Sequence, residues 1–69
     1  GMAAQTMVSG TVTEKATGTP LPGVNVIVKG TATGTTTDFG GNYQIQAPNG
    51  SVLVFSYIGF KNFEATVTG

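Results

Sequence analysis

Polar and apolar residues alternate with a period of two over much of this chain, the pattern of strands that bury one face. The clearest example is residues 42–47, in which the apolar positions alternate with Asn42, Gln44 and Gln46 and are Tyr43, Ile45 and Ala47. Residues 8–14 follow the same rule, and we expect their shared inner face to consist of Val8, Gly10 and Val12. Both segments are predicted to be half-buried strands.

Three other segments complete the predicted strands. Residues 24–29 place valines at 24, 26 and 28 on one face, and Ile27 on the opposite face is expected to cover a sheet edge. Residues 51–57 are apolar on both faces, which is typical of a central strand, so the core is predicted to centre there. Residues 62–68 alternate again, and the positions predicted to point inward are Phe63, Ala65 and Val67.

Residues 35–42 carry a hairpin signal. The threonines at 35–37 predict a short strand, and the turn that follows contains Asp38, Gly40 and Gly41. An aspartate at this position accepts backbone amides two residues on, and the glycines supply the positive φ of a tight turn. We therefore expect residues 35–37 to pair with the strand that begins at Tyr43.

Proline and glycine mark the other connections. Residues 20–23, Pro-Leu-Pro-Gly, lack two amide donors and are predicted to lie outside a central ladder. Residues 48–50, Pro-Asn-Gly, predict a second tight turn, and Gly59 predicts a bulge or bend after the central strand.

These elements predict an all-β fold. No window of the sequence has the apolar spacing of an amphipathic helix, and glycine or proline interrupts nearly every candidate segment. Short strands at intervals of about ten residues, without crossover helices, favour an antiparallel sandwich over an α/β fold. We expect a small Greek-key β-sandwich of about seven strands, in a chain of 69 residues that has room for one domain.

Composition and charge argue against several classes of function. The chain has no Cys and no His or Trp, and its three cationic residues balance its three acidic ones. A neutral chain without arginine lacks the charge that gathers phosphates, so we expect no nucleic-acid partner. The longest apolar run, residues 52–55, is far shorter than the roughly 20 residues of a membrane-spanning helix. We expect the isolated domain to be monomeric and not to span a membrane.

Few residues remain for catalysis or metal binding. Glu14, Asp38 and Glu64 are the carboxylates, and we interpret them as solvated charges at strand ends or on outward strand faces. Asp38-Phe39-Gly40 matches a kinase magnesium motif, but 69 residues leave no room for a nucleotide cleft. Calcium is the metal that Asp38, Asn42 and loop carbonyls would suit best, but one carboxylate is a poor cage, and we favour the interpretation that the two residues cap the hairpin. We therefore expect no catalytic, cofactor-binding or metal-binding residue.

Two surface signals have structural alternatives. Asn49-Gly50-Ser51 matches the N-glycosylation pattern, but it also fits a tight turn. Four aromatic residues lie close together in the sequence and are predicted to belong mainly to the core: Phe55, Tyr57, Phe60 and Phe63. Phe39, at a turn tip, and Phe60, beside a bend, are expected to be the exposed rings, which would suggest a contact surface.

The order of these pieces resembles a known family. The motifs that carry the resemblance begin with residues 8–13, Val-Ser-Gly-Thr-Val-Thr, continue with residues 20–26, 28–31, 34–38 and 41–43, and end with residues 53–60, Leu-Val-Phe-Ser-Tyr-Ile-Gly-Phe. Together they span about residues 7–68 and resemble the carboxypeptidase-regulatory-like domain. The version most similar to them lies at the N-terminus of SusC/RagA-type TonB-dependent transporters of Bacteroidetes.

The resemblance implies a prealbumin-like sandwich of seven strands, held in the periplasm before the plug and barrel of an outer-membrane nutrient importer. It implies a non-enzymatic domain whose partners are the plug and barrel of the same chain, with TonB as a further candidate. Phe60 departs from the family, where Tyr is usual, so a hydrogen bond through that hydroxyl is not expected here.

The domain boundaries follow from this resemblance. Residues 1–6 are expected to be a tag remnant and a disordered lead-in, and residues 7–69 a single β-sandwich domain excised from a larger protein. The alternative interpretation is a carbohydrate-binding or structural module appended to a secreted or surface hydrolase. Exposed Phe39 and Phe60 on one face would favour that alternative.

Overall fold

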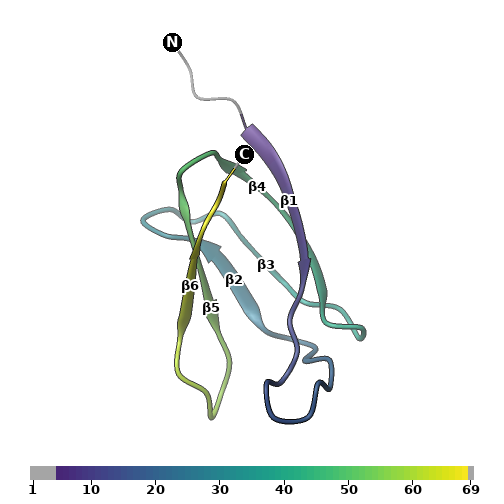
Figure 1. Ribbon diagram of the computed structural model, residues 1–69. Coiled ribbons are helices and arrows are strands. Elements are labelled where there is room, and N and C mark those ends of the chain that lie inside the picture. Colours follow the sequence, from purple (N-terminus) through teal and green to yellow (C-terminus); the bar gives the residue numbers. More distant parts are fainter. Residues whose placement is uncertain (1–4, 69) are drawn as a thin grey trace.

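The computed structural model describes residues 5–68, which form six strands joined by turns and loops, with no helix in this part of the chain (Figure 1). The strands are β1 (Gln5–Thr11), β2 (Asn25–Val28), β3 (Gly34–Thr36), β4 (Asn42–Pro48), β5 (Val52–Ser56) and β6 (Phe63–Thr66). The predicted all-β fold is confirmed, with six strands in place of about seven. No described segment is a helix long and apolar enough to cross a membrane.

The strands form two antiparallel sheets that face each other (Figure 1). One sheet contains β1 and β4, and the other has the order β3-β2-β5-β6. β2 pairs with β5, although two strands separate them in the sequence, and this non-local pairing is of the Greek-key type. The molecule is therefore an unequal sandwich of two strands over four.

β1 begins at Gln5, where pairing with β4 starts opposite Pro48. Thr6 pairs with Ala47, so the ladder includes two residues that the sequence had assigned to the lead-in. The remainder of that predicted lead-in, residues 1–4, lies outside the described residues.

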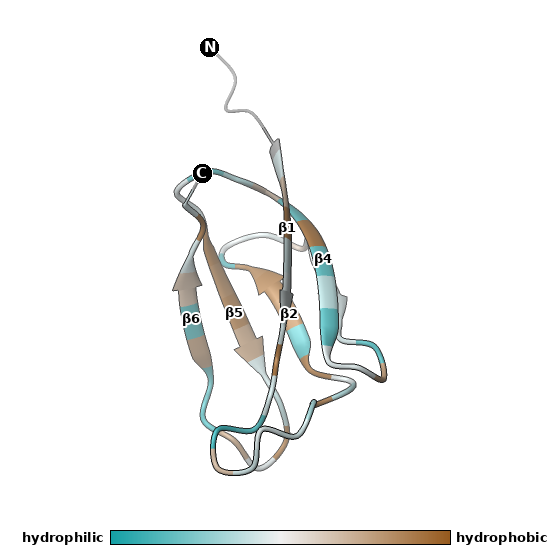
Figure 2. Ribbon diagram, turned by 45° about the vertical axis from the view of Figure 1, so that its right-hand side comes forward, coloured by the Kyte–Doolittle hydropathy of each residue, from teal (hydrophilic) through white to brown (hydrophobic). Residues whose placement is uncertain are grey.

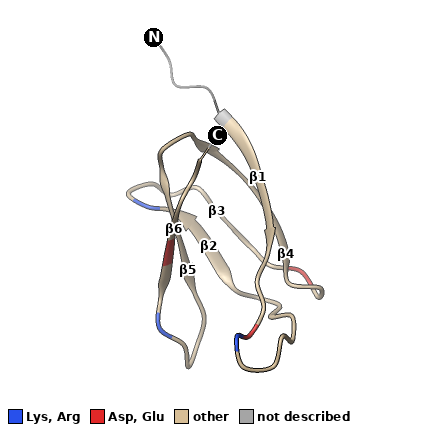
Figure 3. Cartoon of the chain, viewed as in Figure 1, with Lys and Arg blue, Asp and Glu red and all other residues tan. Residues whose placement is uncertain are grey.

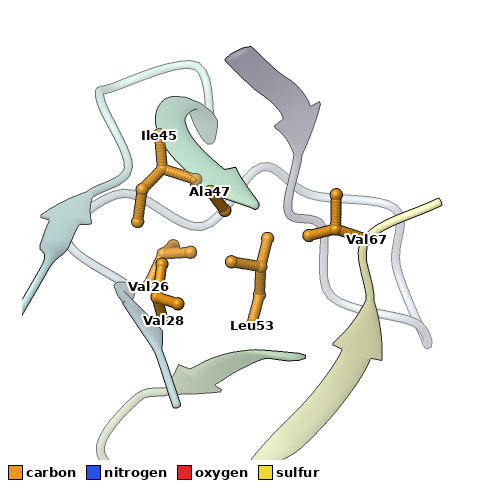
Figure 4. Close-up of a cluster of buried hydrophobic side chains, with 6 residues drawn as sticks. All are labelled: Val26, Val28, Ile45, Ala47, Leu53 and Val67. Atoms are coloured by element: carbon orange, nitrogen blue, oxygen red, sulfur yellow. The ribbon is translucent and has the colours of Figure 1, made fainter. Parts of the chain in front are cut away.

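The core lies between the two sheets (Figure 4). Its central cluster of buried side chains comes from three strands, β2, β4 and β5, and the segment after β6, and consists of Val26, Val28, Ile45, Ala47, Leu53 and Val67. The predicted inner faces of β2 and β4 are confirmed, because the alternate residues of both strands are buried. Figure 2 shows the apolar residues concentrated on β2 and β5.

The prediction that the core centres on residues 51–57 is wrong. Leu53 is the only fully buried apolar residue of that segment among the described residues, whereas β2 and the residue before it contribute Val24, Val26 and Val28. β5 is nevertheless central in its sheet, since it pairs with both β2 and β6. Its second face remains half-exposed because no layer covers the outside of the four-stranded sheet among the described residues.

The predicted hairpin between residues 35–37 and the strand from Tyr43 is also wrong. β3 pairs with β2, whereas β4 pairs with β1 in the opposite sheet. The turn itself forms as expected: one Asp38 carboxylate oxygen, Oδ1, accepts the amides of Gly40 and Asn42, each at 2.9 Å. The turn therefore carries the chain from one sheet to the other.

The side chain of Thr37 holds the end of β3 beside the segment that leads into β2. Its buried hydroxyl donates to the Leu21 carbonyl at 2.6 Å and accepts the Val24 amide at 2.9 Å. These bonds tie the end of β3 to the segment that leads into β2. The preceding prolines stay outside a central ladder, as predicted, and Pro20 makes only an isolated bridge with Thr13.

β5 and β6 form a hairpin around the turn at residues 57–60. Gly59 has φ 84°, and the Phe60 amide donates to the Tyr57 carbonyl at 3.1 Å, so the predicted bend is a tight turn. Ile27 does not cover an edge, since β2 is flanked by β3 and β5. It lies half-exposed on the outer face of the four-stranded sheet.

Candidate functional site

The three carboxylates lie on different elements (Figure 3). Glu64 on β6 forms an exposed ion pair with Lys29, at 3.1 Å between its Oε2 and the lysine Nζ. Glu14, in the loop after β1, accepts the Thr17 hydroxyl at 2.8 Å. Asp38 lies in the turn between β3 and β4, where it caps backbone amides. Each carboxylate therefore has its own local role, and the fold does not pair them.

The residues proposed for calcium, Asp38 and Asn42, are engaged in holding the turn. Besides the two amides that Asp38 accepts, the Asn42 side-chain oxygen accepts the Thr11 hydroxyl at 2.7 Å. Over residues 5–68, no group of three potential metal-ligating side chains comes together. The arrangement fits the capping interpretation of this turn.

The Asn49-Gly50-Ser51 sequence forms the turn between β4 and β5. Gly50 has φ 89°, and Ser51 bonds twice to the Pro48 carbonyl, through its amide at 3.1 Å and its hydroxyl at 2.6 Å. The predicted tight turn is confirmed.

Aromatic rings form a row along one open side of the sandwich. Tyr43 on β4 meets Phe55 on β5 edge-to-face, with ring centroids 5.4 Å apart, and Phe55 meets Phe63 on β6 at 6.0 Å. Tyr43 and Phe55 are half-buried and pack against the core cluster. Phe63 is on the predicted inner face but is 65% exposed, so the expectation that this ring belongs to the core is wrong.

The Tyr43 side chain, in this aromatic row, is partly buried. Burial raises the pKa of its phenol above the ordinary value of 10.0, because the surrounding protein disfavours the charged phenolate. The phenol is therefore neutral in the folded protein near neutral pH.

A groove of about 700 Å³ opens beside this aromatic row. The residues that line it include Val12 in the segment that continues β1, Tyr43 and Phe55 of the aromatic row, and Phe63 and Ala65 on β6. The sequence pattern predicted the inward direction of Val12, Tyr43, Phe63 and Ala65, but gave no direction for Phe55. It did not predict the groove, because an open flank depends on which strands neighbour one another.

Two turn tips expose large apolar side chains. Phe39 is 95% exposed in the turn after β3, and Ile58 is 90% exposed in the turn after β5. Phe60 is 46% exposed and lies against Tyr57, with ring centroids 5.8 Å apart. The predicted exposure of Phe39 and Phe60 is confirmed. The exposure of Ile58 was not predicted, although its place beside Gly59 in a turn is the signal that identifies it.

Phe39 and Phe60 lie next to different edge strands of the four-stranded sheet. Phe39 follows β3, one edge of the four-stranded sheet, whereas Phe60 precedes β6, the opposite edge. β2 and β5 lie between those edges. The two rings therefore do not form the common aromatic platform on which the hydrolase-module alternative depends.

A sequence model of the CarboxypepD_reg-like domain matches residues 8–69. TonB-dependent receptor P3 of Formosa agariphila is 57% identical over 61 residues, covering 87% of this chain and 6% of the receptor. TonB-dependent receptor SusC of Bacteroides thetaiotaomicron is 49% identical over 56 residues, covering 81% of this chain and 6% of the receptor. TonB-dependent receptor P39 of Formosa agariphila is 49% identical over 65 residues. No solved structure matches the chain.

The chain thus spans about 6% of the length of the receptors that it matches. Their sequence identity, together with the match over nearly all its residues and the all-β sandwich, makes the chain a member of the CarboxypepD_reg-like domain family, in the form shared with SusC-type TonB-dependent receptors.

Proposed function

We propose that this chain is a non-enzymatic accessory domain of a TonB-dependent outer-membrane nutrient transporter and lies in the periplasm before the plug. The observation that carries the proposal is the 57% identity to a TonB-dependent receptor over 61 residues. The separation of the three carboxylates onto different elements supports a role without catalysis.

The proposed mechanism is mechanical and depends on protein contacts. A compact sandwich ahead of the segment that TonB contacts would limit or organise the access of TonB to the plug. The turn tips that carry Phe39 and Ile58 provide apolar surface for contacts with the plug and barrel of the same polypeptide.

The native gene provides the first test of this placement. Its translation beyond Gly69 should give a short polar segment, a plug-like domain and many amphipathic strands of about ten residues, the length expected of a barrel strand. A catalytic domain in that position would contradict the transporter proposal and would support the hydrolase-module alternative. Fractionation of cells carrying an epitope in the loop at residues 15–19 then tests whether the domain faces the periplasm.

The half-exposed Tyr57–Phe60 pair is the observation that favours the carbohydrate-binding alternative. Addition of oligosaccharides to the labelled chain, followed by NMR, tests it directly. Under the transporter proposal the resonances of Phe39, Tyr57 and Phe60 stay in place. Saturable shifts confined to Tyr57 and Phe60, and lost in the Phe60→Ala chain, would favour glycan binding.

A further inference from the structure

β4 is an edge strand, because β1 is its one partner among the described strands. The Val12 amide donates to the Gly41 carbonyl, so the backbone of Gly41 faces β1. The direction of backbone groups alternates along a strand, so every second residue after Gly41 directs its N–H and C=O away from β1. The residues with outward groups are Asn42, Gln44, Gln46 and Pro48.

The two ends of this outer edge are already engaged within the chain. The Asn42 amide donates to Oδ1 of Asp38, and the Asn42 carbonyl accepts the Asp38 amide, each at 2.9 Å. Pro48 has no amide hydrogen, and its carbonyl accepts the amide of Ser51 at 3.1 Å and its hydroxyl at 2.6 Å. No hydrogen bond from the rest of the described chain reaches the outward backbone groups of the two glutamines between these ends. The open positions of the edge are therefore these two.

The two open positions are complementary to each other in a two-fold pair. Residues opposite each other in an antiparallel pair exchange both of their N–H···O=C bonds where their backbone groups point inward. When Gln44 of one copy lies opposite Gln46 of a second copy, two-fold symmetry creates the same contact a second time. That register also places Asn42 opposite Pro48, where the backbone groups need no partner. One symmetric pairing therefore satisfies both open positions.

The side chains and the charge of the chain favour the same pairing. Both glutamines are exposed on the outer face of β4, and a side-chain amide can donate to and accept from the amide opposite it. β4 is seven residues long and uncharged, in a chain of zero net charge, so two copies do not repel each other. The edges of the other sheet are less suited to pairing, since β3 has three residues and β6 carries the charge of Glu64.

β1 carries the second open edge of the same sheet. The sandwich of seven strands that the resemblance implies has one strand more than the described chain. The free edge of β1, beside the apolar groove, has room for that strand. β4 then remains the outer strand of the sheet, and an uncharged edge of this length is expected to be covered in the native protein.

We infer that β4 binds a second copy of this domain by antiparallel β4–β4 pairing, with Gln44 of each copy opposite Gln46 of the other. The inference goes beyond the proposed function and does not depend on it. One pair of strand edges buries far less than the roughly 1,200 Å² of a stable interface, so we expect a Kd on the order of 1 mM. The dilute domain is then monomeric, and two copies pair where they are concentrated.

Disulfide exchange between two single-cysteine variants tests the register, since the chain contains no cysteine of its own. In the inferred pairing, the substituted positions of Gln44→Cys and Gln46→Cys lie opposite each other, with about 5.5 Å between Cα atoms, which suits a disulfide. Two copies of the same variant place their cysteines on a diagonal, at about 7–8 Å, which a disulfide does not span without backbone movement.

The two variants are mixed at about 1 mM in a glutathione buffer, and the disulfide-linked species are separated by mass. We expect the mixed disulfide to exceed its statistical proportion to the two homodisulfides by at least about threefold. The same mixture in urea should return to the statistical proportion, because the excess depends on the folded strand. A statistical mixture under native conditions would overturn the inference.

Amide hydrogen exchange tests the pairing in the unsubstituted chain. Raising the concentration from about 0.02 mM to about 2 mM should slow exchange at Gln44 and Gln46 at least about twofold. The outward amides of β1, those of Met7, Ser9 and Thr11, should exchange at the same rate at both concentrations. Equal rates at the two glutamines across this range would overturn the inference.

A matched pair of variants tests the role of the open backbone groups. Gln44→Pro removes an outward amide donor without removing a bond to β1, whereas Gln44→Ala leaves that donor in place. The slowing of exchange at Gln46 should persist in Gln44→Ala and disappear in Gln44→Pro. Slowing that persisted in both variants would overturn the inference. The disulfide ratio and the unsubstituted chain decide the question even where Gln44→Pro fails to fold.

Two further outcomes would assign a different contact. Slowing confined to Met7, Ser9 and Thr11 at high concentration would assign self-pairing to β1 and overturn the inference. Protection of Gln44 and Gln46 that appears only in a longer piece of the parent polypeptide, and does not change with concentration, would assign the edge to another segment of that polypeptide. This outcome would also overturn the inference.

Discussion

The ring of Tyr43 lies directly over Gly10, its opposite residue in the β1–β4 ladder. A Cβ atom at position 10 would lie 2.6 Å from the Tyr43 hydroxyl oxygen and 2.8 Å from the ring carbon that bears it. Glycine at this strand position therefore creates the space in which the ring reaches Phe55. The relationship connects the two-stranded sheet to the aromatic row of the facing sheet.

Substitution of Gly10 by alanine should displace that ring. We expect Gly10→Ala to lower the free energy of unfolding by about 1–3 kcal/mol, the usual cost of overpacking. Urea unfolding measures the change. In the Tyr43→Ala background the same substitution should cost much less, because the clashing atoms are absent. An equal cost in both backgrounds would show that the ring is not the cause.

The Thr37 hydroxyl should contribute strongly to stability. Thr37→Val keeps the shape of the side chain but leaves the partly buried Leu21 carbonyl and the buried Val24 amide without their partner. We expect a loss of about 1–3 kcal/mol in the free energy of unfolding. Thr36→Val, at an exposed neighbouring position, is the matched control and should change stability by less than about 0.5 kcal/mol. Similar losses in both variants would contradict the assignment.

Two glycines with similar backbone angles should differ in their tolerance of alanine. Gly41 has φ 77° and Gly50 has φ 89°, so alanine at either position adopts a left-handed conformation that costs about 1–2 kcal/mol. A Cβ at position 41 would also lie 2.5 Å from the Val12 carbonyl oxygen, whereas position 50 is open. Thermal unfolding should therefore show Gly41→Ala to be the less stable variant. Equal stability of the two variants would contradict the importance of the close contact between a Cβ at position 41 and the Val12 carbonyl oxygen.

Burial of Tyr43 should make stability fall in alkaline solution. Because the pKa of its phenol is raised in the folded state, the unfolded chain loses this proton first, near 10.0. The contribution of this group is complete below that pH and is lost as the pH rises through the folded-state pKa. Denaturant unfolding across this range should show a smaller decline for Tyr43→Phe than for the parent. Identical declines would contradict the burial of the phenol.

Local sequence patterns predicted which face of each strand is buried. In β4, the half-buried Tyr43 and buried Ile45 and Ala47 alternate with exposed polar residues, as the period of two requires. The turns at Asp38, Gly50 and Gly59 were equally predictable, because each depends on a capping side chain or a positive φ within a few residues. Interactions between residues close together in the sequence were therefore sufficient to predict these features.

Strand partners were less predictable, since they depend on contacts between distant residues. The hairpin signal at residues 35–42 was misleading because Thr37 bonds to Leu21 and Val24, while Asn42 bonds to Thr11 in β1. These long-range bonds direct β3 and β4 into different sheets. For the same reason, the alternation in β6 gave the inward direction of Phe63 but not its exposure at an open flank.

Deletion of this domain from the parent receptor tests the central claim most directly. The measurement is energised nutrient uptake, normalised to the amount of receptor assembled in the outer membrane, with the deletion compared to a receptor that carries Thr36→Val in the intact domain. The account predicts that the deletion changes assembly or normalised uptake, while the substituted receptor behaves as the parent does. Unchanged assembly and unchanged uptake after deletion would contradict an accessory role in transport.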